Sequence, residues 1–197
     1  DFVTQSFHPV KSITTGEGGS ILTNKKKFDE KFKLLRNHSM IKNKNKYWEY
    51  KIFEAGNNYR ITDFQCALGI SQIKKLNKFI KSRREIANIY NTNFKGDERF
   101  KIPPERKNIC HSYHLYPLQI NFEKFKFDKD YLIKKFLKYG IRMQVHYIPL
   151  HYQPYYKKNA IFDRKNLSKS EKFYKKQVSL PIYPSLKRIK LDYIIKK

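Results

Sequence analysis

Hydrophobic and polar positions alternate near the start of the chain, and a helical spacing follows. Phe2–Phe7 and Ser20–Thr23 predict two short strands, joined by a segment that ends in a glycine-rich turn. Phe28–Arg36 carries apolar residues at helical spacing and predicts a helix. Residues 37–58 show no clear period and predict irregular structure, with Lys42–Lys46 as an exposed loop.

A long helix is predicted next. Thr62 and Gln65 form the T-x-x-Q pattern of a capping box, which marks a helix start. A stripe of apolar residues follows at helical spacing and can be extended as far as Tyr90. We expect this helix to bridge two domains. The stripe consists of Phe64, Leu68, Ile73, Leu76 and Ile80.

The pattern changes after the long helix. Tyr113–Phe122 predicts a strand, and Pro117 places that strand at a sheet edge or a bulge because proline cannot donate to the ladder. Tyr131–Tyr139 predicts a helix that Gly140 terminates. Ile141–Tyr147 predicts another strand.

A second capping box is predicted at Ser168 and Glu171, and it would open a helix that runs to about Gln177. Strands and helices therefore alternate from about residue 84, which is typical of an α+β or α/β module. The chain shows no internal repeat.

Composition favours a packed protein. Hydrophobic residues make up 40% of the 197 positions, and no apolar run approaches the roughly 20 residues of a membrane helix. The chain has two cysteines, Cys66 and Cys110, too few for a disulfide framework or a cysteine metal cluster. We expect a reducing compartment and no membrane association.

The net charge of +26 raises the possibility of a polyanionic partner. The excess is mostly lysine and is spread along the whole chain, which predicts a generally basic surface. No zinc-finger, helix-turn-helix or RNA-binding pattern accompanies it. A basic nucleic-acid-binding module without catalysis is the alternative from a different functional class, and we expect no nucleic-acid partner.

The stretch Ser6–Gly19 combines a lysine with hydroxyls and glycines. Lys11 lies between the two predicted strands, where partial burial would favour its neutral amine, and a neutral amine can form a Schiff base with an aldehyde. The hydroxyls and the glycine N–H groups suit a phosphate. Pyridoxal phosphate (PLP) unites both chemistries. The alternative is an ordinary solvated lysine.

This stretch resembles the cofactor-lysine signature of the DegT/DnrJ/EryC1/StrS sugar aminotransferases. Further blocks similar to family motifs follow in the family's order, although Ser39 stands where glycine is usual. They are Leu35–Ser39, Gly56–Gly69, His114–Tyr116, Val145–Tyr156 and Leu180–Pro184.

The resemblance implies an α/β fold, namely the C-terminal half of a fold-type-I PLP-dependent transferase. Residues 1–83 would form the end of the large mixed-sheet, PLP-binding domain, including the bridging helix. Residues 84–197 would form the small α+β C-terminal domain. Family members are nearly twice as long, and the groups that cup the phosphate and hold the pyridine ring would lie outside this chain. We therefore expect the 197-residue chain alone to be inactive and to expose apolar surface.

The resemblance also implies roles for cofactor-binding residues. Lys11 would hold PLP covalently and carry a proton during catalysis. Ser6 would bind the cofactor phosphate, or would be an ordinary strand serine. Asn58 would reach the cofactor phosphate of the neighbouring subunit in a homodimer, or would be a turn asparagine before a helix.

Four residues are implied as contacts to the substrate: Arg60, His146, Tyr147 and His151. The alternative for Arg60 is a local ion pair with Asp63, and for the other three it is aromatic packing beside the prolines of the same motif. The histidines of the chain match no metal-ligand spacing, so we expect no metal site.

The implied reaction is transfer of an amino group from glutamate to C4 of a UDP-linked 4-keto-6-deoxy sugar, in the cytoplasm. A transaminase for another nucleotide-linked keto sugar is the alternative within the family.

Overall fold

The computed structural model describes residues 1–160 and 167–197. The chain divides into two compact units, Asp1–Leu76 and Asn77–Lys197. The domain boundary expected near residue 83 falls inside helix α3 (Leu76–Phe94). The assignment of the units to a large and a small aminotransferase domain remains a prediction. In the described ranges, no helix has both the length and the apolar character required to span a membrane.

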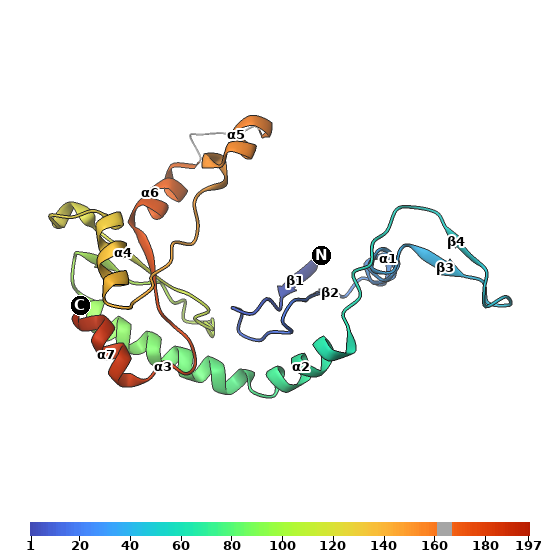
Figure 1. Ribbon diagram of the computed structural model, residues 1–197, viewed down its shortest axis with the longest axis horizontal. Helices are drawn as coiled ribbons and strands as arrows, with labels where there is room; N and C mark the ends of the chain where they lie inside the picture. Colours follow the sequence, from blue (N-terminus) through green and yellow to red (C-terminus); the bar gives the residue numbers. More distant parts are fainter. Residues whose placement is uncertain (161–166) are drawn as a thin grey trace. The chain divides into compact units, whose positions relative to one another are not determined.

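An antiparallel hairpin opens the first unit (Figure 1). It consists of β1 (Phe2–Ser6) and β2 (Gly19–Thr23), whose register pairs Ser6 with Gly19. Both predicted strands are confirmed. Residues 7–18, which include Lys11, form the loop that joins the two strands.

Helix α1 (Lys26–Arg36) packs its aromatic face on the first strand. The ring of Phe2 meets those of Phe28 and Phe32 edge-on, with centroids 6.0 and 5.4 Å apart. This predicted helix is therefore confirmed, and its aromatic residues hold helix and strand together.

The segment predicted to be irregular contains a second hairpin. β3 (Met40–Lys42) pairs antiparallel with β4 (Tyr50–Ile52). Each strand has three residues, too few for an alternating pattern to be recognised. The exposed loop predicted at Lys42–Lys46 begins at Asn43 instead, because Lys42 still belongs to β3 and pairs with Tyr50.

The predicted capping box at the start of α2 (Asp63–Ile73) is confirmed. The N–H of Gln65 donates to Thr62 Oγ1 at 3.4 Å, and the N–H of Thr62 donates to Gln65 Oε1 at 2.9 Å. The prediction of one continuous helix is wrong, because the chain turns at Lys74–Lys75 before α3 begins. There the N–H of Lys75 bonds the carbonyl of Gln72, three residues back, which tightens the last turn of α2.

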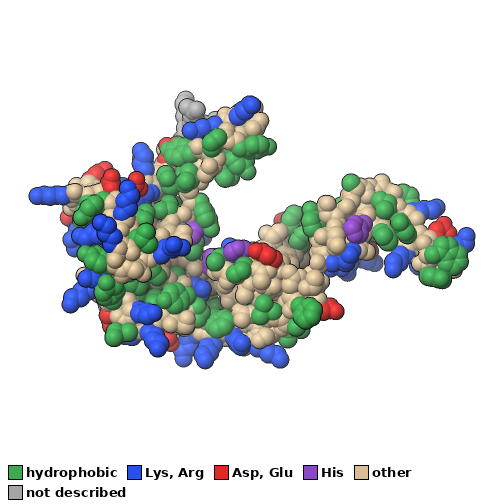
Figure 2. All heavy atoms as spheres, in the orientation of Figure 1, with side chains coloured by type: hydrophobic (Ala, Val, Ile, Leu, Met, Phe, Trp, Pro, Cys, Tyr) green, Lys and Arg blue, Asp and Glu red, His purple; other side chains and the backbone are tan. Residues whose placement is uncertain are grey.

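The apolar stripe along the two helices has two different environments. In α3, Ile86, Ala87 and Tyr90 are buried. In α2 the stripe is exposed, and Phe64 keeps 91% of its surface accessible. Hydrophobic side chains are also visible on the surface of the β3–β4 hairpin (Figure 2). The first unit thus exposes apolar surface, in agreement with the expectation.

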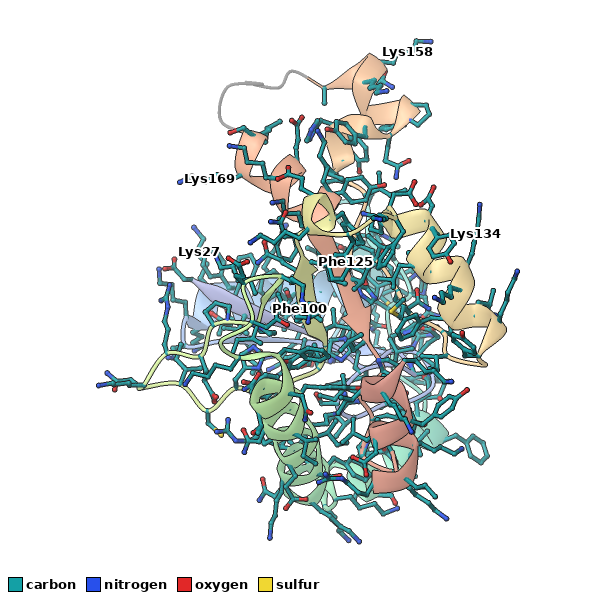
Figure 3. All side chains as sticks on the ribbon, turned by 90° about the vertical axis from the view of Figure 1, so that its left-hand side faces the viewer. Lys27, Phe100, Phe125, Lys134, Lys158 and Lys169 are labelled. Carbon is teal, nitrogen blue, oxygen red and sulfur yellow. The ribbon has the colours of Figure 1, made fainter. Side chains whose placement is uncertain are left out.

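The second unit contains an antiparallel sheet of three strands in the order β5–β6–β7. They are β5 (Phe100–Lys101), β6 (Tyr116–Ile120) and β7 (Gln177–Leu180). Helices α3 and α7 (Arg188–Lys196) lie side by side and contribute to the same core (Figures 1 and 3). Phe100 and Phe125, labelled in Figure 3, pack at the margin of this core with centroids 6.1 Å apart.

Pro117 lies in the central strand of this sheet, which corrects the prediction of an edge strand. Its partner Ser179 bonds Gln144 through both its N–H and its carbonyl, so the Pro117–Ser179 pair is of the type without mutual hydrogen bonds. The nitrogen of Pro117 therefore faces the β5 side, and β5 pairs only with Gln119 and Ile120. The strand is central, but no ladder bond is lost at the proline.

The predicted helix with its glycine stop is confirmed as α4 (Lys129–Lys138). Asp128 caps its start by accepting from the N–H of Tyr131 at 2.8 Å. Gly140 follows the helix with a φ of 74°, a left-handed conformation that glycine adopts without strain. Two short 3-10 helices, η1 (Phe122–Lys124) and η2 (Leu150–Tyr152), flank this part of the chain.

Two further predictions are wrong. Residues 141–147 form no strand, and only Gln144 makes a bridge, to Ser179. Beyond them lie α5 (Pro154–Asn159) and α6 (Ser168–Lys176). The capping box expected at Ser168 and Glu171 is absent from α6, whose N-cap is Leu167 and makes no side-chain bond. Glu171 instead bonds a histidine of η2.

A buried arginine ties α3 to the rest of the second unit. Arg83 is 5% exposed, and its Nη1 donates to the carbonyls of Tyr113, His114 and Ile182 at 2.9–3.2 Å. Burial lowers the pKa of the guanidinium from its usual value. The side chain thus satisfies carbonyls of two distant segments at once.

Candidate active site

The loop that carries Lys11 is closed by main-chain bonds. The N–H of Phe7 donates to Gly18 at 2.9 Å, and the carbonyl of Phe7 accepts from the N–H of Thr15 at 3.0 Å and from the hydroxyl of Thr14 at 2.9 Å. The N–H of Lys11 donates to the carbonyl of His8 at 2.9 Å. These bonds hold the half-buried Lys11 in a defined place at the end of the β1–β2 hairpin.

The same loop is docked on α2. The carbonyl of Glu17 accepts from the hydroxyl of Thr15 at 2.6 Å and from Gln65 Nε2 at 2.9 Å. Gly69 leaves room for the Thr15 side chain, since a Cβ at that position would lie 3.0 Å from Thr15 Cγ2. Two of the motif blocks, the lysine loop and Gly56–Gly69, are therefore joined through Thr15, Glu17 and Gln65.

Gly18→Ala is expected to destabilise the lysine loop by about 2 kcal/mol or more. Gly18 has a φ of 152°, and a Cβ there would overlap the Thr15 hydroxyl. Gly16→Ala is the matched control, because Gly16 also has a positive φ (80°) but faces open space. We expect it to cost only about 1 kcal/mol.

Native-state hydrogen exchange of the β1 and β2 amides measures both costs. Equal protection in the two variants would show that the contact of Gly18 with Thr15 does not shape the loop.

The block Gly56–Gly69 also meets a third block, Leu35–Ser39, in the first unit. The N–H groups of Asn57 and Tyr59 donate to the carbonyls of Leu35 and Arg36 at 3.0 and 2.9 Å. Those carbonyls belong to the last turn of α1, where helix carbonyls lack intrahelical partners. The block Gly56–Gly69 thereby supplies hydrogen-bond donors to the last carbonyls of α1, at which the block Leu35–Ser39 begins.

Ser39 shows why glycine is usual at its place in the family pattern. Its φ is 52°, in the left-handed region, and its side chain is buried. Gly56 passes so close that a Cβ there would overlap the backbone of Ser39. The serine is accommodated because Gly56 leaves it space.

Asn58 and Arg60 lie together on an exposed surface. Asn58 Oδ1 accepts from the N–H of Arg60 at 3.3 Å, and Arg60 Nη1 donates to Asn37 Oδ1 at 2.6 Å. The ion pairs formed within the described ranges do not include one between Arg60 and Asp63. The roles expected for Asn58 and Arg60 in binding phosphate and substrate remain predictions.

The remaining candidates, His146, Tyr147 and His151, lie in the second unit. His146 is anchored to β7: its N–H donates to Gln177 Oε1 at 3.0 Å, and its Nδ1 lies 2.8 Å from Ser179 Oγ. Tyr147 follows through a cis peptide bond and is 71% exposed. Its ring meets that of His146 edge-on at 4.7 Å.

His151 has a carboxylate partner. Its Nε2 lies 2.9 Å from Glu171 Oε1, which joins η2 to α6. The bond from His151 holds the pKa of Glu171 below its usual range. This contact gives His151 an anchoring role in the second unit, and its expected contact with substrate remains a prediction.

A cavity of about 380 Å³ opens beside these residues. Tyr147 and Phe173 contribute aromatic surface to it, and Lys169, which projects from α6 in Figure 3, contributes a positive charge. In the ranges that the structure describes, no group of three or more His, Cys, Asp or Glu side chains is placed to hold a metal ion.

Comparison with protein families decides the classification. The model of the DegT/DnrJ/EryC1/StrS aminotransferase family matches residues 1–197. The chain belongs to this family. The family resemblance expected from the motif blocks is thereby confirmed.

Within the DegT/DnrJ/EryC1/StrS family, this chain is similar to a transaminase of known name and to two aminotransferases of known structure. UDP-4-amino-4,6-dideoxy-N-acetyl-beta-L-altrosamine transaminase of Campylobacter jejuni is 39% identical over 92% of this chain and 47% of its own length. The structure of Helicobacter pylori PseC, an aminotransferase involved in the biosynthesis of pseudoaminic acid, matches 99% of this chain and 51% of its own with a TM-score of 0.86 and 33% identity. The PLP form of the putative sugar aminotransferase Spr1654 from Streptococcus pneumoniae matches with a TM-score of 0.87 and 29% identity, covering all of this chain and 50% of its own.

The chain thus spans about half the length of the family members it matches. The expected α/β fold of a PLP-dependent aminotransferase is confirmed, because the matching structures cover the whole chain.

The donor groups of the lysine loop fit PLP, the cofactor of this family. Lys11 offers a primary amine in a loop that is fixed at both ends. The exposed hydroxyl of Ser6 accepts only a long bond, 3.4 Å, from the N–H of His8, so its proton can be donated to a phosphate oxygen. Both groups lie on the same hairpin, and it remains a prediction that Lys11 and Ser6, with Asn58 at the neighbouring subunit's site, would hold the cofactor.

Sequence reasoning missed the residues that support the candidates. Gln177 and Ser179 hold His146, Glu171 holds His151, and Thr15 shapes the lysine loop. The only available signal was that buried polar side chains need partners, and the sequence does not reveal which polar residues are buried.

Proposed function

We propose that the protein containing this chain is a PLP-dependent aminotransferase acting on a nucleotide-linked keto sugar. The observation that supports this best is the β1–β2 hairpin, which presents Lys11 in a closed loop with the Ser6 hydroxyl at the adjoining strand end. When bound, PLP supplies the electron sink for breaking a C–H bond beside nitrogen. Lys11 supplies the amine that anchors the cofactor and carries the proton to and from the reacting carbon.

We propose glutamate as amino donor and C4 of a UDP-linked 4-keto-6-deoxy sugar as acceptor. The reaction would convert glutamate to 2-oxoglutarate and the sugar ketone to an amine. The identity of 39% to the Campylobacter jejuni transaminase supports this choice. Arg60, His146, Tyr147 and His151 are the proposed substrate contacts in this chain, and the cavity beside Tyr147 offers aromatic surface and a lysine to an anionic ligand with a flat ring.

We further propose a cytoplasmic homodimer in which Asn58 reaches the cofactor phosphate of the neighbouring subunit. The amide of Asn58 is exposed, and its Oδ1 is oriented by the N–H of Arg60. An amide N–H₂ held in this way can donate to a phosphate oxygen.

The test is a substrate panel with the full gene product, glutamate and PLP. We expect amination of a UDP-linked 4-keto-6-deoxy-N-acetylhexosamine with a kcat/KM at least about tenfold above that for a GDP-linked 4-keto-6-deoxyhexose. Mass spectrometry identifies the products, and the sugar carbon that carries the new C–N bond is then determined for each. A preference for the GDP-linked sugar would replace the proposed substrate. If the protein aminates no sugar of the panel and copurifies with nucleic acid, the alternative of a basic nucleic-acid-binding module is favoured instead.

A further inference from the structure

Gln65 uses both ends of its side-chain amide. Its Oε1 accepts from the N–H of Thr62 at 2.9 Å and from the Thr62 hydroxyl at 3.0 Å, whereas its Nε2 donates to the carbonyl of Glu17 at 2.9 Å. The capping box accounts for the first two contacts, and it needs no donor at this position, since glutamate serves in it as well as glutamine. The amide nitrogen therefore has a separate use, in the loop that carries Lys11.

The groups at either end fix the orientation of this amide. The N–H of Thr62 can only donate and the carbonyl of Glu17 can only accept, so the oxygen of Gln65 faces the helix start and the nitrogen faces the loop. The carbonyl of Glu17 has two lone pairs, and the hydroxyl of the buried Thr15 occupies the other one at 2.6 Å. Both lone pairs are thus used only while Gln65 supplies its N–H.

The lysine loop meets α2 at two points on one face of the helix. Gln65 and Gly69 have the i, i+4 spacing that places residues above one another on a helix. Gln65 bonds the carbonyl of Glu17, and Gly69 faces the methyl group of Thr15, which a Cβ at Gly69 would approach to 3.0 Å. A single contact would let the loop pivot, whereas two contacts restrict its direction as well as its distance from the helix.

The place of Lys11 follows from that of Thr15. The N–H of Thr15 donates to the carbonyl of Phe7 at 3.0 Å and closes the short segment that contains Lys11, whose own N–H donates to the carbonyl of His8 at 2.9 Å. A shift of Thr15 along α2 would therefore carry Lys11 with it. A misplacement of about 1 Å at a reacting group can cost roughly 10²-fold in rate.

We propose that Gln65 is a positioning residue for Lys11: its amide nitrogen holds the lysine loop on the first turn of α2 and so sets where the amine lies. The task of the amine, which is to hold the cofactor, rests on the proposed function, whereas the docking of the loop does not. Gln65 itself touches neither cofactor nor substrate in this proposal.

Gln65→Glu separates positioning of the loop from support of the helix. The ionised carboxylate keeps the capping box, because it accepts from the N–H of Thr62, and its negative charge is favourable at a helix N-terminus. It has no proton to donate, so it sets an oxygen against the carbonyl of Glu17. Thr62→Ala is the converse variant, because it removes the capping hydroxyl but leaves the Gln65 amide nitrogen able to donate to Glu17.

The first readout is hydrogen exchange of the cofactor-free full gene product at neutral pH, followed by mass spectrometry. In Gln65→Glu we expect protection to fall about tenfold in the lysine loop and to be retained in α2. In Thr62→Ala we expect it to fall about fivefold in the first turn of α2 and to be retained in the loop. Retained loop protection in Gln65→Glu, or an equal loss in loop and helix, would overturn the proposal.

Gln72→Glu is the matched control, because it adds the same charge further along the same helix, at a side chain without a hydrogen bond among the described residues. It should leave the protection of the loop unchanged. If Gln65→Glu does not fold, Gln65→Met takes its place, since methionine is unbranched and offers neither an N–H donor nor a strong acceptor. Its loop should also lose protection about tenfold, and loop protection equal to that of Thr62→Ala would overturn the proposal.

The second readout is the apparent Kd for PLP, obtained by titrating the visible band. We expect this Kd to rise about tenfold in Gln65→Glu and to stay within about twofold of wild type in Thr62→Ala and Gln72→Glu. Reduced loop protection with unchanged PLP binding would overturn the assignment of Gln65 as a positioning residue for Lys11. Absence of the band in wild type would instead refute the proposed function, and the exchange data would still decide whether Gln65 holds the loop.

Discussion

Lys11→Ala is expected to lower kcat for transamination by roughly 10³-fold or more, because the variant loses in one change both the proton carrier and the amine that anchors the cofactor. The loop around Lys11 should persist in the variant. Its closing bonds use the main chain of Phe7, Thr15 and Gly18 and the hydroxyl of Thr14 rather than the lysine side chain. The visible absorbance of the purified full gene product with PLP is the direct measurement, with loss of the yellow band expected in the variant.

Two controls make the Lys11 result specific. Lys26→Ala removes an exposed lysine of α1 whose contact is an ion pair with Glu30, and it should keep both the band and the activity. Lys11→Arg keeps the positive charge but not the nucleophile, and it should behave like Lys11→Ala. A yellow, active Lys11→Ala protein would refute the cofactor role of this lysine.

Tyr90→Ala is expected to destabilise the second unit by about 4 kcal/mol. Tyr90 is completely buried, its ring lies 4.8 Å from that of Tyr116, and its hydroxyl donates to the carbonyl of Pro181 at 2.8 Å. Burial also raises the pKa of this hydroxyl well above its usual value. The free energy of opening at the β7 amides, from native-state hydrogen exchange, measures the loss.

Two further substitutions separate the contributions to the stability lost in Tyr90→Ala. Tyr90→Phe removes only the hydroxyl and should cost about 1 kcal/mol, the usual net value of a hydrogen bond. Tyr131→Ala, at a half-exposed position on α4, should cost far less than Tyr90→Ala. A loss of equal size in Tyr90→Ala and Tyr131→Ala would contradict the assignment of Tyr90 to the core.

The elements that could be predicted have strong local signals. Thr62 and Gln65 specify a helix start through bonds made within four residues, and Gly140 specifies a helix end through its own backbone freedom. The first hairpin was predictable because its strands are five residues long and enclose several glycines. In each case the interaction that fixes the element is made by the same few residues whose sequence pattern predicts it.

The failed predictions depended on partners far away in the sequence. Ser168 and Glu171 have the spacing of a capping box, but Glu171 bonds His151, twenty residues away. The apolar residues at 141–147 suggested a strand, yet the main chain there pairs with β7 only at Gln144. Local propensity was outweighed by tertiary contacts in both places.

The candidate site was predictable only where the family pattern supplied it. Lys11, Ser6 and Asn58 stand inside recognisable motif blocks, whereas Gln177 and Ser179 do not bear on His146 until the chain has folded. Their contacts with His146 span 31 and 33 residues. A buried amide or hydroxyl has no sequence pattern of its own, since the same residue types also form turns and surface positions.

The core of the second unit draws on both of its sequence ends. The hydroxyl of Ser82 in α3 donates to the carbonyl of Pro184, 102 residues later, and Arg83 reaches Ile182. Val178, Leu180 and Leu191 supply buried side chains from β7 and α7. On the ribosome, the apolar face of α3 therefore cannot be fully covered until about a hundred further residues have emerged, and part of it stays exposed during that interval.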